Sequence, residues 1–468
     1  MNAIWQLDAT DTAALIRAGR LSAREVVDAH LARLDAVNPK LHAVVHRMHE
    51  QARADADAAD RHQRAGGALG PLHGVPITIK ITADMAGFAS DNGVRLFKDL
   101  VAPADAPVVR NLKAAGAVVI GRTNSPAFAM RFMTDNALHG PTLNPWRRDV
   151  TCGGSSGGAG AAAAAGIGAL AHGTDIGGSI RWPAYCNGIV GLRTTPGRVP
   201  SYNQTAQGDH PMAAQLMAVA GPMARSVRDA ALAFRVMAGS GHPADPCWLP
   251  VPLDGLPPLP RRAALVTEYP GLALHPSSVD AVRRAGTCLA AAGWTVVEAA
   301  PPDLPRAFEL WEPIGLSDVR ARLEPLLDMV GDPGLAASQR AWWAEAAPCD
   351  LSTYQKALGE RHTLMRRWGQ FQSETPIVIM PAGAAPFAFA DHDTREGGMR
   401  WLLEHFGRFL FPAPVLGLPV LSLPLGQHDG LPQGVQIHAP RYREDLCLEA
   451  GALIEAHEGP RPAIDPAW

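Results

Sequence analysis

The chain has 468 residues, of which 47% are hydrophobic and 19% are charged. This composition is typical of a globular protein with a large core and argues against a disordered chain. The formal net charge of −3 offers no basic field for nucleic acid and no polybasic anchor for a membrane. We therefore expect neither a nucleic-acid partner nor a membrane partner.

The first 65 residues are predicted to form a helical collar. Ser22 and Glu25 form a capping box before an amphipathic helix, which Asn38-Pro39 should break, and a charged helix should follow to about His62. The N-terminal segment is acidic where a signal peptide is basic, which predicts a cytoplasmic protein. The six cysteines lie far apart without a CxxC pair, so we expect reduced thiols and no metal site.

A catalytic core is expected over residues 66–240, where short strands alternate with helices. The pattern predicts strands at 74–80 and 117–120, a helix at 108–115, a loop at 121–126 and a further apolar run at 188–192. Such alternation indicates an α/β sheet with helices on both faces.

The second half is divided at about residue 375. Residues 241–375 are read as a variable region that shapes the pocket, with a β-α-β unit over 263–297, whose helix is expected at 278–292, and helical patterns over 305–370. The latter hold four tryptophans, for which a core-facing stripe is the commoner explanation and a cap over a site the alternative: Trp311, Trp342, Trp343 and Trp368. Residues 376–468 should return strands at 377–380, 420–423 and 434–437 to the same sheet.

The stretch from Cys152 to Pro183 contains two serine sites, each after a pair of glycines: Ser155-Ser156 and Ser179. The Ala-rich segment between these sites is expected to form one buried helix. Glycines permit tight turns and close approach of the backbone to a ligand. Residues 153–157 also fit the GxSxG elbow of other hydrolases, but no buried strand precedes them. Residues 116–123 nearly fit a phosphate-binding loop, but Arg122 stands where a lysine is required.

Lys80, Ser155 and Ser179 form the candidate catalytic set. Amide cleavage needs a nucleophile, a base and donors for the developing oxyanion. A lysine is a base only when it is neutral, which burial favours, and Lys80 lies between two isoleucines. Taken singly, each residue is more often ordinary: a strand-end lysine, a linker serine, a turn serine.

Taken together, these segments resemble the amidase signature family. The resemblance is carried by GGSSGGAGAAAAAGIGALAHGTDIGGSIRWPAYCNGIVGL and by LHGVPITIK, VVIGRTNSPAF and GLPVLSLPLG, and it spans roughly residues 5–240 and 375–455. It implies one domain over residues 1–468, an α/β/α sandwich with a large twisted mixed sheet. It also implies an amide hydrolase that forms an acyl-enzyme and needs no cofactor and no metal.

The resemblance further implies a Ser-cisSer-Lys triad. Ser179 matches the nucleophile, Ser155 the bridging serine with a cis bond to Gly154, and Lys80 the general base. The oxyanion-hole N–H groups would come from four residues of the second turn: Ile176, Gly177, Gly178 and Ser179. Structural support for that turn would come from Ser156, Thr174, Asp175 and Arg181.

The chain departs from the family pattern at three positions. Ile81 stands where an acidic residue is common, and Leu410 and Pro414 stand where many members have Thr and Asn. Ile81 should favour a neutral Lys80, whereas Leu410 and Pro414 argue against a small polar substrate and favour a hydrophobic or aryl small-molecule amide. Five residues are expected to line the pocket: Met130, Phe132, Phe387, Phe389 and Phe411.

Three alternatives stay open. The same triad would serve a hydrolase of carbamates, esters or oligoamides. The chain could also be the glutaminase component of a tRNA-dependent amidotransferase, its A subunit, or a catalytically silent binding protein on this fold. A homodimer is common among family members and is a further expectation.

Overall fold

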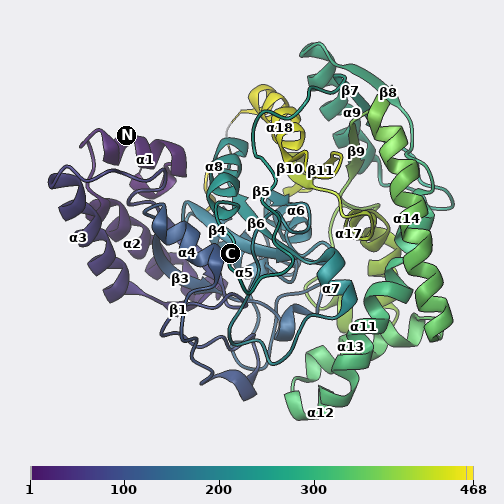
Figure 1. The fold of residues 1–468 in the computed structure, drawn as a ribbon, viewed down its shortest axis with the longest axis horizontal. Helices are drawn as coiled ribbons and strands as arrows, with labels where there is room; N and C mark the ends of the chain where they lie inside the picture. The colour runs from purple at the N-terminus through teal and green to yellow at the C-terminus, as the bar shows by residue number, and fades with distance from the viewer. Residues whose placement is uncertain (1–2, 460, 467) are drawn as a thin grey trace.

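The computed structural model describes residues 3–459, 461–466 and 468 (Figure 1). In these residues one eleven-stranded sheet has the order β1-β3-β2-β4-β6-β5-β10-β11-β9-β7-β8. The strands are β1 (Val44–Arg47), β2 (Pro76–Lys80), β3 (Val118–Thr123), β4 (Leu170–Asp175), β5 (Val190–Arg193), β6 (Val219–Ala224), β7 (Arg262–Leu265), β8 (Thr295–Glu298), β9 (Ile377–Pro381), β10 (Val420–His428) and β11 (Leu431–His438). Parallel pairs join β2 to β3 and β4, and β7 to β8 and β9, whereas β10 and β11 pair antiparallel. The predicted mixed sheet is confirmed.

The α-helices in the described residues run from the collar to the C-terminal end. They are α1 (Ala9–Arg17), α2 (Ala23–Leu41), α3 (His49–Arg64), α4 (Pro107–Ala114), α5 (Gly157–Ala164), α6 (Arg181–Asn187), α7 (Met212–Met217), α8 (Val227–Met237), α9 (Pro276–Ala291), α10 (Leu304–Glu309), α11 (Ser317–Leu323), α12 (Leu327–Val330), α13 (Pro333–Glu345), α14 (Leu351–Glu374), α15 (Gly398–Leu402), α16 (Arg408–Leu410), α17 (Pro412–Leu416) and α18 (Glu444–Glu458). The predicted helices at 108–115 and 278–292 correspond to α4 and α9.

Helices cover both faces of the sheet. Side chains of α4, α8, α9 and α18 share one buried apolar cluster with strand residues such as Leu170. Side chains of α5 and α6 share another cluster with Ala171. Because successive strand residues point to opposite faces, these neighbours in β4 place the two clusters on opposite sides. The prediction of helices on both faces is therefore confirmed.

The N-terminal collar lies at one end of the sheet, at the left of Figure 1, and contains one unpredicted strand, β1. The capping box is present, since Ser22 accepts from Glu25 N–H and the Glu25 carboxylate accepts from Ser22 N–H. The predicted break at Asn38-Pro39 is wrong, because α2 continues to Leu41. Proline costs only one helical bond in a last turn, and the Asn38 side chain accepts from the amide of Val44 at 2.8 Å just beyond it.

Two local predictions in the core are corrected. Residues 121–123, expected in a loop, extend β3, where they pair with both β1 and β2. The Ala-rich segment is not one helix between the serine sites: α5 ends at Ala164, and β4 follows at Leu170–Asp175. Gly166 adopts a φ of +76°, which ends the helix and lets the chain turn into the sheet.

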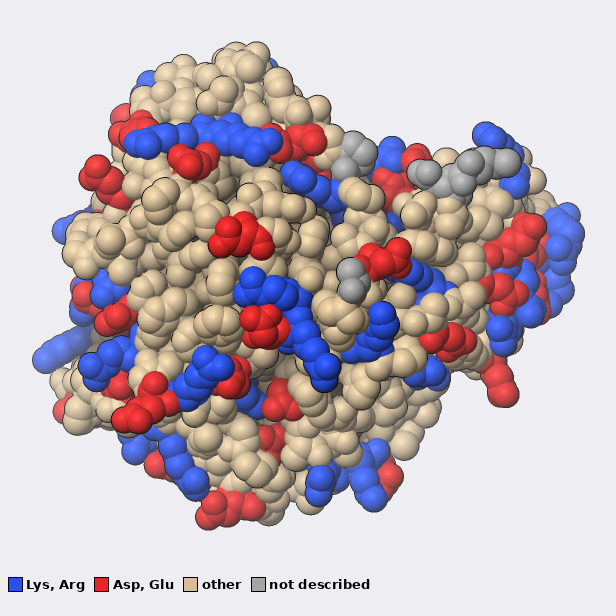
Figure 2. Space-filling model, turned by 180° about the vertical axis from the view of Figure 1, so that it is seen from behind, with Lys and Arg blue, Asp and Glu red and all other residues tan. Residues whose placement is uncertain are grey.

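Helices α10 to α14 form a second helical region at the opposite end from the collar, with the long α14 along the right of Figure 1. Within the described chain, no helix combines the length and the apolar character that crossing a membrane requires. On the face seen in Figure 2, blue and red side chains are interspersed over the described residues, without a broad area of one sign.

Candidate active site

Lys80 ends strand β2, which lies between β3 and β4 and whose five residues are all buried. Its Nζ lies 2.7 Å from Ser155 Oγ, 3.1 Å from Ser156 Oγ and 2.9 Å from Thr174 Oγ1. Burial lowers the pKa of Lys80 to about 7, against a smaller opposing effect of Asp175. A large fraction of this amine is therefore neutral near neutral pH, with a lone pair that accepts a proton.

The hydroxyl of Ser156 is already engaged on the far side of Lys80. It donates to the carbonyl of Thr174 at 3.2 Å and accepts from the Thr174 amide at 3.3 Å. Its hydrogen therefore points away from the amine, whereas Ser155 makes no other side-chain hydrogen bond within the described residues. Ser155 is thus free to donate to a neutral Lys80.

The first serine turn is held very close to the segment before it. The peptide bond between Gly154 and Ser155 is cis. A Cβ on Gly154 would lie 2.6 Å from the carbonyl oxygen of Arg131 and 2.7 Å from the carbonyl carbon of Phe132. Only glycine permits this close approach of the two backbone segments. Glycine at position 154 therefore lets Ser155 lie next to the segment that contains Phe132.

Ser179 lies in the turn between β4 and α6, and Asp175 organises that turn. The buried carboxylate of Asp175 accepts from the amides of Gly178 at 2.9 Å and Ile180 at 3.2 Å. It also pairs with the buried guanidinium groups of Arg181 at 3.1 Å and Arg193 at 3.0 Å. Burial by itself would raise the pKa of Asp175, but these two cations lower it below its usual range.

The amides of this turn are not equivalent. The amide of Gly178 donates to the carboxylate of Asp175 at 2.9 Å, and its expected place in the oxyanion hole stays a prediction. The amides of Ile176, Gly177 and Ser179 donate to no group in the described residues. Leu410 packs against Gly178, since a Cβ there would lie 3.0 Å from its side chain.

Ser179 faces a narrow cavity of about 50 Å³. It is lined by Ala129, Met130, Arg131, Phe132, Gly154, Ile176, Gly177, Ser179, Trp182, Trp311, Leu316, Val319, Gln339, Trp342 and Phe411. Phe411 is the centre of the aromatic wall: its ring centroid lies 4.8 Å from that of Trp311 and 5.8 Å from that of Trp342. Phe132 also belongs to this aromatic wall, since its ring centroid lies 5.6 Å from that of Trp342.

The predicted lining is partly correct. Met130, Phe132 and Phe411 line the cavity, but Phe387 and Phe389 do not. Phe387 lines a separate small cavity with Val150 and Tyr185, and the ring of Phe389 packs edge-on against that of Phe387, with their centroids 5.6 Å apart.

Several lining residues were missed as site residues: Arg131, Trp182, Trp311, Gln339 and Trp342. Trp182 lies in the quoted glycine- and serine-rich stretch, and Trp311 and Trp342 belong to the aromatic pattern over 305–370, for which a core-facing stripe was the expected explanation. Arg131 is the charged member, and its guanidinium pairs with buried Asp393 at 2.8 and 3.0 Å. The described lining therefore offers a substrate no unpaired charge.

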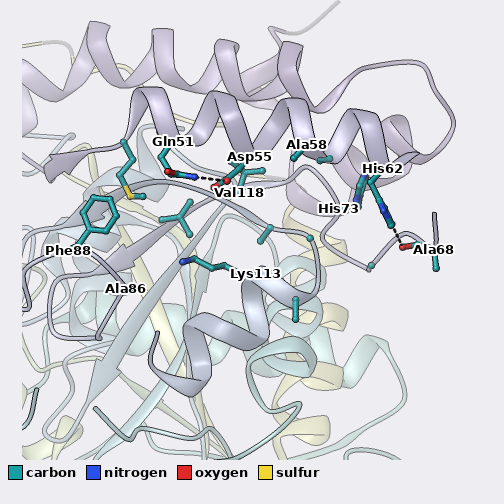
Figure 3. A pocket seen from close by; sticks show the side chains of 17 residues that line it. Gln51, Asp55, Ala58, His62, Ala68, His73, Ala86, Phe88, Lys113 and Val118 are labelled. Atoms are coloured by element: carbon teal, nitrogen blue, oxygen red, sulfur yellow. Dashed lines mark hydrogen bonds between the residues drawn. The ribbon is translucent and has the colours of Figure 1, made fainter. Parts of the chain in front are cut away.

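Other sites lie apart from this cavity. A groove of about 560 Å³ runs between α3 and α4, with Asp55, His62 and Lys113 among its lining residues, and it contains none of the predicted catalytic residues (Figure 3). Among the described residues, His46, Asp91 and His139 form a group whose ligand atoms lie within 4.8 Å of one another and could hold a metal ion. In the structure the two histidines contact the Asp91 carboxylate at 2.7 and 3.1 Å.

Comparison with known proteins identifies the class of the chain. The family model described as Amidase matches residues 25–448. The chain therefore belongs to the amidase family, and its mixed sheet and helical layers are those of solved amidase signature enzymes. It is an amidase, a hydrolase of carbon–nitrogen amide bonds, as the sequence predicted.

Two relatives and one solved structure illustrate the range of the family. The indoleacetamide hydrolase of Bradyrhizobium diazoefficiens is 45% identical over 458 residues, 97% of this chain and 87% of that protein. The acylamidase of Rhodococcus erythropolis is 32% identical over 480 residues, 97% of this chain and 96% of that protein. The structure of a bacterial aryl acylamidase of the amidase signature family superimposes with a TM-score of 0.82 at 27% identity, covering 97% of each chain.

Proposed function

We propose that this amidase hydrolyses the carboxamide of a small arylacetamide, of the indoleacetamide type, to the carboxylic acid and ammonia. The observation that carries the proposal is the pairing of Ser179 with an aromatic cavity whose one charged lining residue, Arg131, is paired with Asp393. Flat rings favour stacked or edge-on contact with other aromatic rings. The 45% identity to an indoleacetamide hydrolase points to the same substrate class.

In the proposed reaction, Lys80 is the base, Ser155 the relay and Ser179 the nucleophile. Neutral Lys80 takes the hydroxyl proton of Ser155 as Ser155 takes that of Ser179. Ser179 Oγ bonds to the amide carbon, and the oxyanion is stabilised by the free amides of Ile176, Gly177 and Ser179. The proton held at Lys80 returns through Ser155 to the leaving nitrogen, the C–N bond breaks, and ammonia departs.

Water completes the cycle. While the water oxygen bonds to the acyl carbon, a water proton passes to Ser155 and Lys80. The ester bond between the acyl carbon and Ser179 Oγ then breaks. Ser179 regains its proton and the carboxylic acid is released. Each turnover consumes one amide and one water, and the chain's own residues move every proton.

Glutamine, the ammonia source of a tRNA-dependent amidotransferase, fits this cavity poorly. Its ammonium and carboxylate need charged partners, since an unpaired charge is costly to bury. The charged lining residue, Arg131, is already neutralised by Asp393.

The test is a substrate panel on the purified protein alone, with ammonia release as the readout. We expect kcat/KM for indole-3-acetamide and naphthalene-1-acetamide to exceed that for hexanamide and for glutamine at least about tenfold, the discrimination that one or two apolar contacts supply. Phenyl carbamates and phenyl esters, followed by release of phenol, would separate amide hydrolysis from the alternative substrates. A preference for glutamine would contradict the proposal.

The nucleophile is tested with a fluorophosphonate probe. Ser179→Ala should abolish both labelling and ammonia release, because the acyl-enzyme can no longer form. Ser373→Ala is the matched control, because Ser373 is an exposed residue of α14, and this variant should behave as the wild type. Labelling that persists in Ser179→Ala would reject Ser179 as the nucleophile. The cytoplasmic location and the homodimer stay predictions.

A further inference from the structure

Gln339 is a buried polar residue among the apolar and aromatic side chains of the substrate cavity. It lies on α13, is 1% exposed and lines the cavity together with Ser179. Its Nε2 donates to the carbonyl of Met130 at 2.6 Å. Its Oε1 is buried and accepts no hydrogen bond from the described residues.

The orientation of this amide is fixed by its surroundings. A flip of the side chain would set Oε1 against the carbonyl oxygen of Met130, two acceptors facing each other, so Nε2 stays on that side. The helix that carries Gln339 is also anchored, since Asp332 caps it by accepting from Leu335 N–H and also from Ala137 N–H, both at 2.8 Å. The free acceptor is thus held in place before any ligand binds.

A buried acceptor without a partner is destabilising and is rare in folded proteins. One other polar atom of the lining side chains is buried without a partner, Trp311 Nε1, and it is a donor. Oε1 of Gln339 is therefore the buried, unpaired side-chain acceptor among the described residues around this cavity. A ligand that satisfies it must bring an N–H or O–H group into an aromatic pocket.

We infer that Gln339 is a specificity-determining residue that accepts a hydrogen bond from a ring N–H of the substrate, and so selects indole-type arylacetamides over rings without a donor. This inference rests on the proposed function and names the substrate more narrowly. The carboxamide end binds at Ser179, the ring stacks against Phe411 and its neighbours, and the ring N–H meets Oε1. A ring of the same shape without the N–H leaves Oε1 unpaired when water is expelled.

The experiment compares indole-3-acetamide with 1-benzothiophene-3-acetamide, in which sulfur replaces the ring N–H in a similar bicycle. The readout is the ratio of their kcat/KM values. For the wild type we expect a ratio of at least about ten in favour of the indole, because sites built for a donor reject analogues that lack it. In Gln339→Leu and Gln339→Met the ratio should fall towards one, mainly through KM.

Gln372→Leu is the matched control. Gln372 is also 1% exposed and also has an unpaired side-chain atom, Nε2, but it lies on α14 away from the cavity lining. The Gln372→Leu variant should show the same ratio of kcat/KM values for the two substrates as the wild type. Equal kcat/KM values for the two substrates in the wild type, or an unchanged ratio in both Gln339 variants, would overturn the role of Gln339 and leave the proposed function standing. If the wild type hydrolysed neither arylacetamide, both the role of Gln339 and the proposed function would be wrong.

Discussion

The reactive side of the cavity and its aromatic side are built in different ways. On the reactive side, Lys80, Ser155 and Asp175 are fully or almost fully buried and joined to their neighbours by short polar contacts. On the aromatic side, Phe411 and Trp342 contact each other as rings, and Trp342 is only partly buried. Directional contacts fix atoms for chemistry, whereas ring contacts position a substrate with some freedom to adjust.

This difference predicts separate kinetic effects. Changes on the reactive side should act on kcat, because their interactions with the substrate arise in the transition state. Changes on the aromatic side should act on KM, because stacking is similar in the ground state and the transition state. The three predictions below test this division.

The largest effect is expected for Lys80→Met, which removes the amine and keeps an apolar chain of similar length. General-base catalysis contributes about 10²- to 10⁴-fold, so kcat/KM for an arylacetamide should fall by that factor. Thermal unfolding should show that the variant is folded, because no buried charge is left unpaired. Lys98→Met, at a lysine whose side chain is 64% exposed, is the control. Turnover within threefold of the wild type would remove Lys80 from the mechanism.

The second effect is the pH dependence of kcat/KM. Because burial places the pKa of Lys80 at about 7, protonation below that pH removes the base. The rate should fall about tenfold per unit of pH well below 7 and level off above it, as for any base with a single pKa. Initial rates between pH 5.5 and 8.5, at substrate concentrations below KM, measure the profile. A flat profile across this range would contradict a lysine base.

The smallest effect is expected for Trp342→Ala on the aromatic side. An aromatic pair contributes about 0.5–1.5 kcal/mol beyond area burial, so KM should rise by about two- to thirteenfold while kcat stays within twofold. Trp401→Ala is the control, since this ring stacks between His392 and His405, 4.4 Å from each, and lies outside the cavity lining. A large loss of kcat at unchanged KM would contradict the prediction that the aromatic side acts on KM and the reactive side on kcat.

The family, the mixed sheet with helices on both faces and the candidate residues of the reactive side could all be predicted from the amino-acid sequence. These features depend on short contiguous patterns: glycine pairs before Ser155 and Ser179, and the apolar strand before Lys80. Local patterns of this kind are visible because backbone conformation depends mainly on near neighbours. The same logic failed at residues 121–123, where pairing with two other strands extended β3.

The choice of side chains that line the cavity depends instead on how remote segments pack. Trp311, Gln339 and Trp342 read as ordinary positions of helices, and Phe387 and Phe389 read as pocket residues although both lie outside the lining of this cavity. Which face of a helix lines a cavity is set by the contacts between distant elements, and no local pattern encodes that. The free acceptor of Gln339 and the hydrogen bond from the Gly178 amide to Asp175 could be recognised only when their surroundings were placed in space, because an unpaired atom is defined by its neighbours.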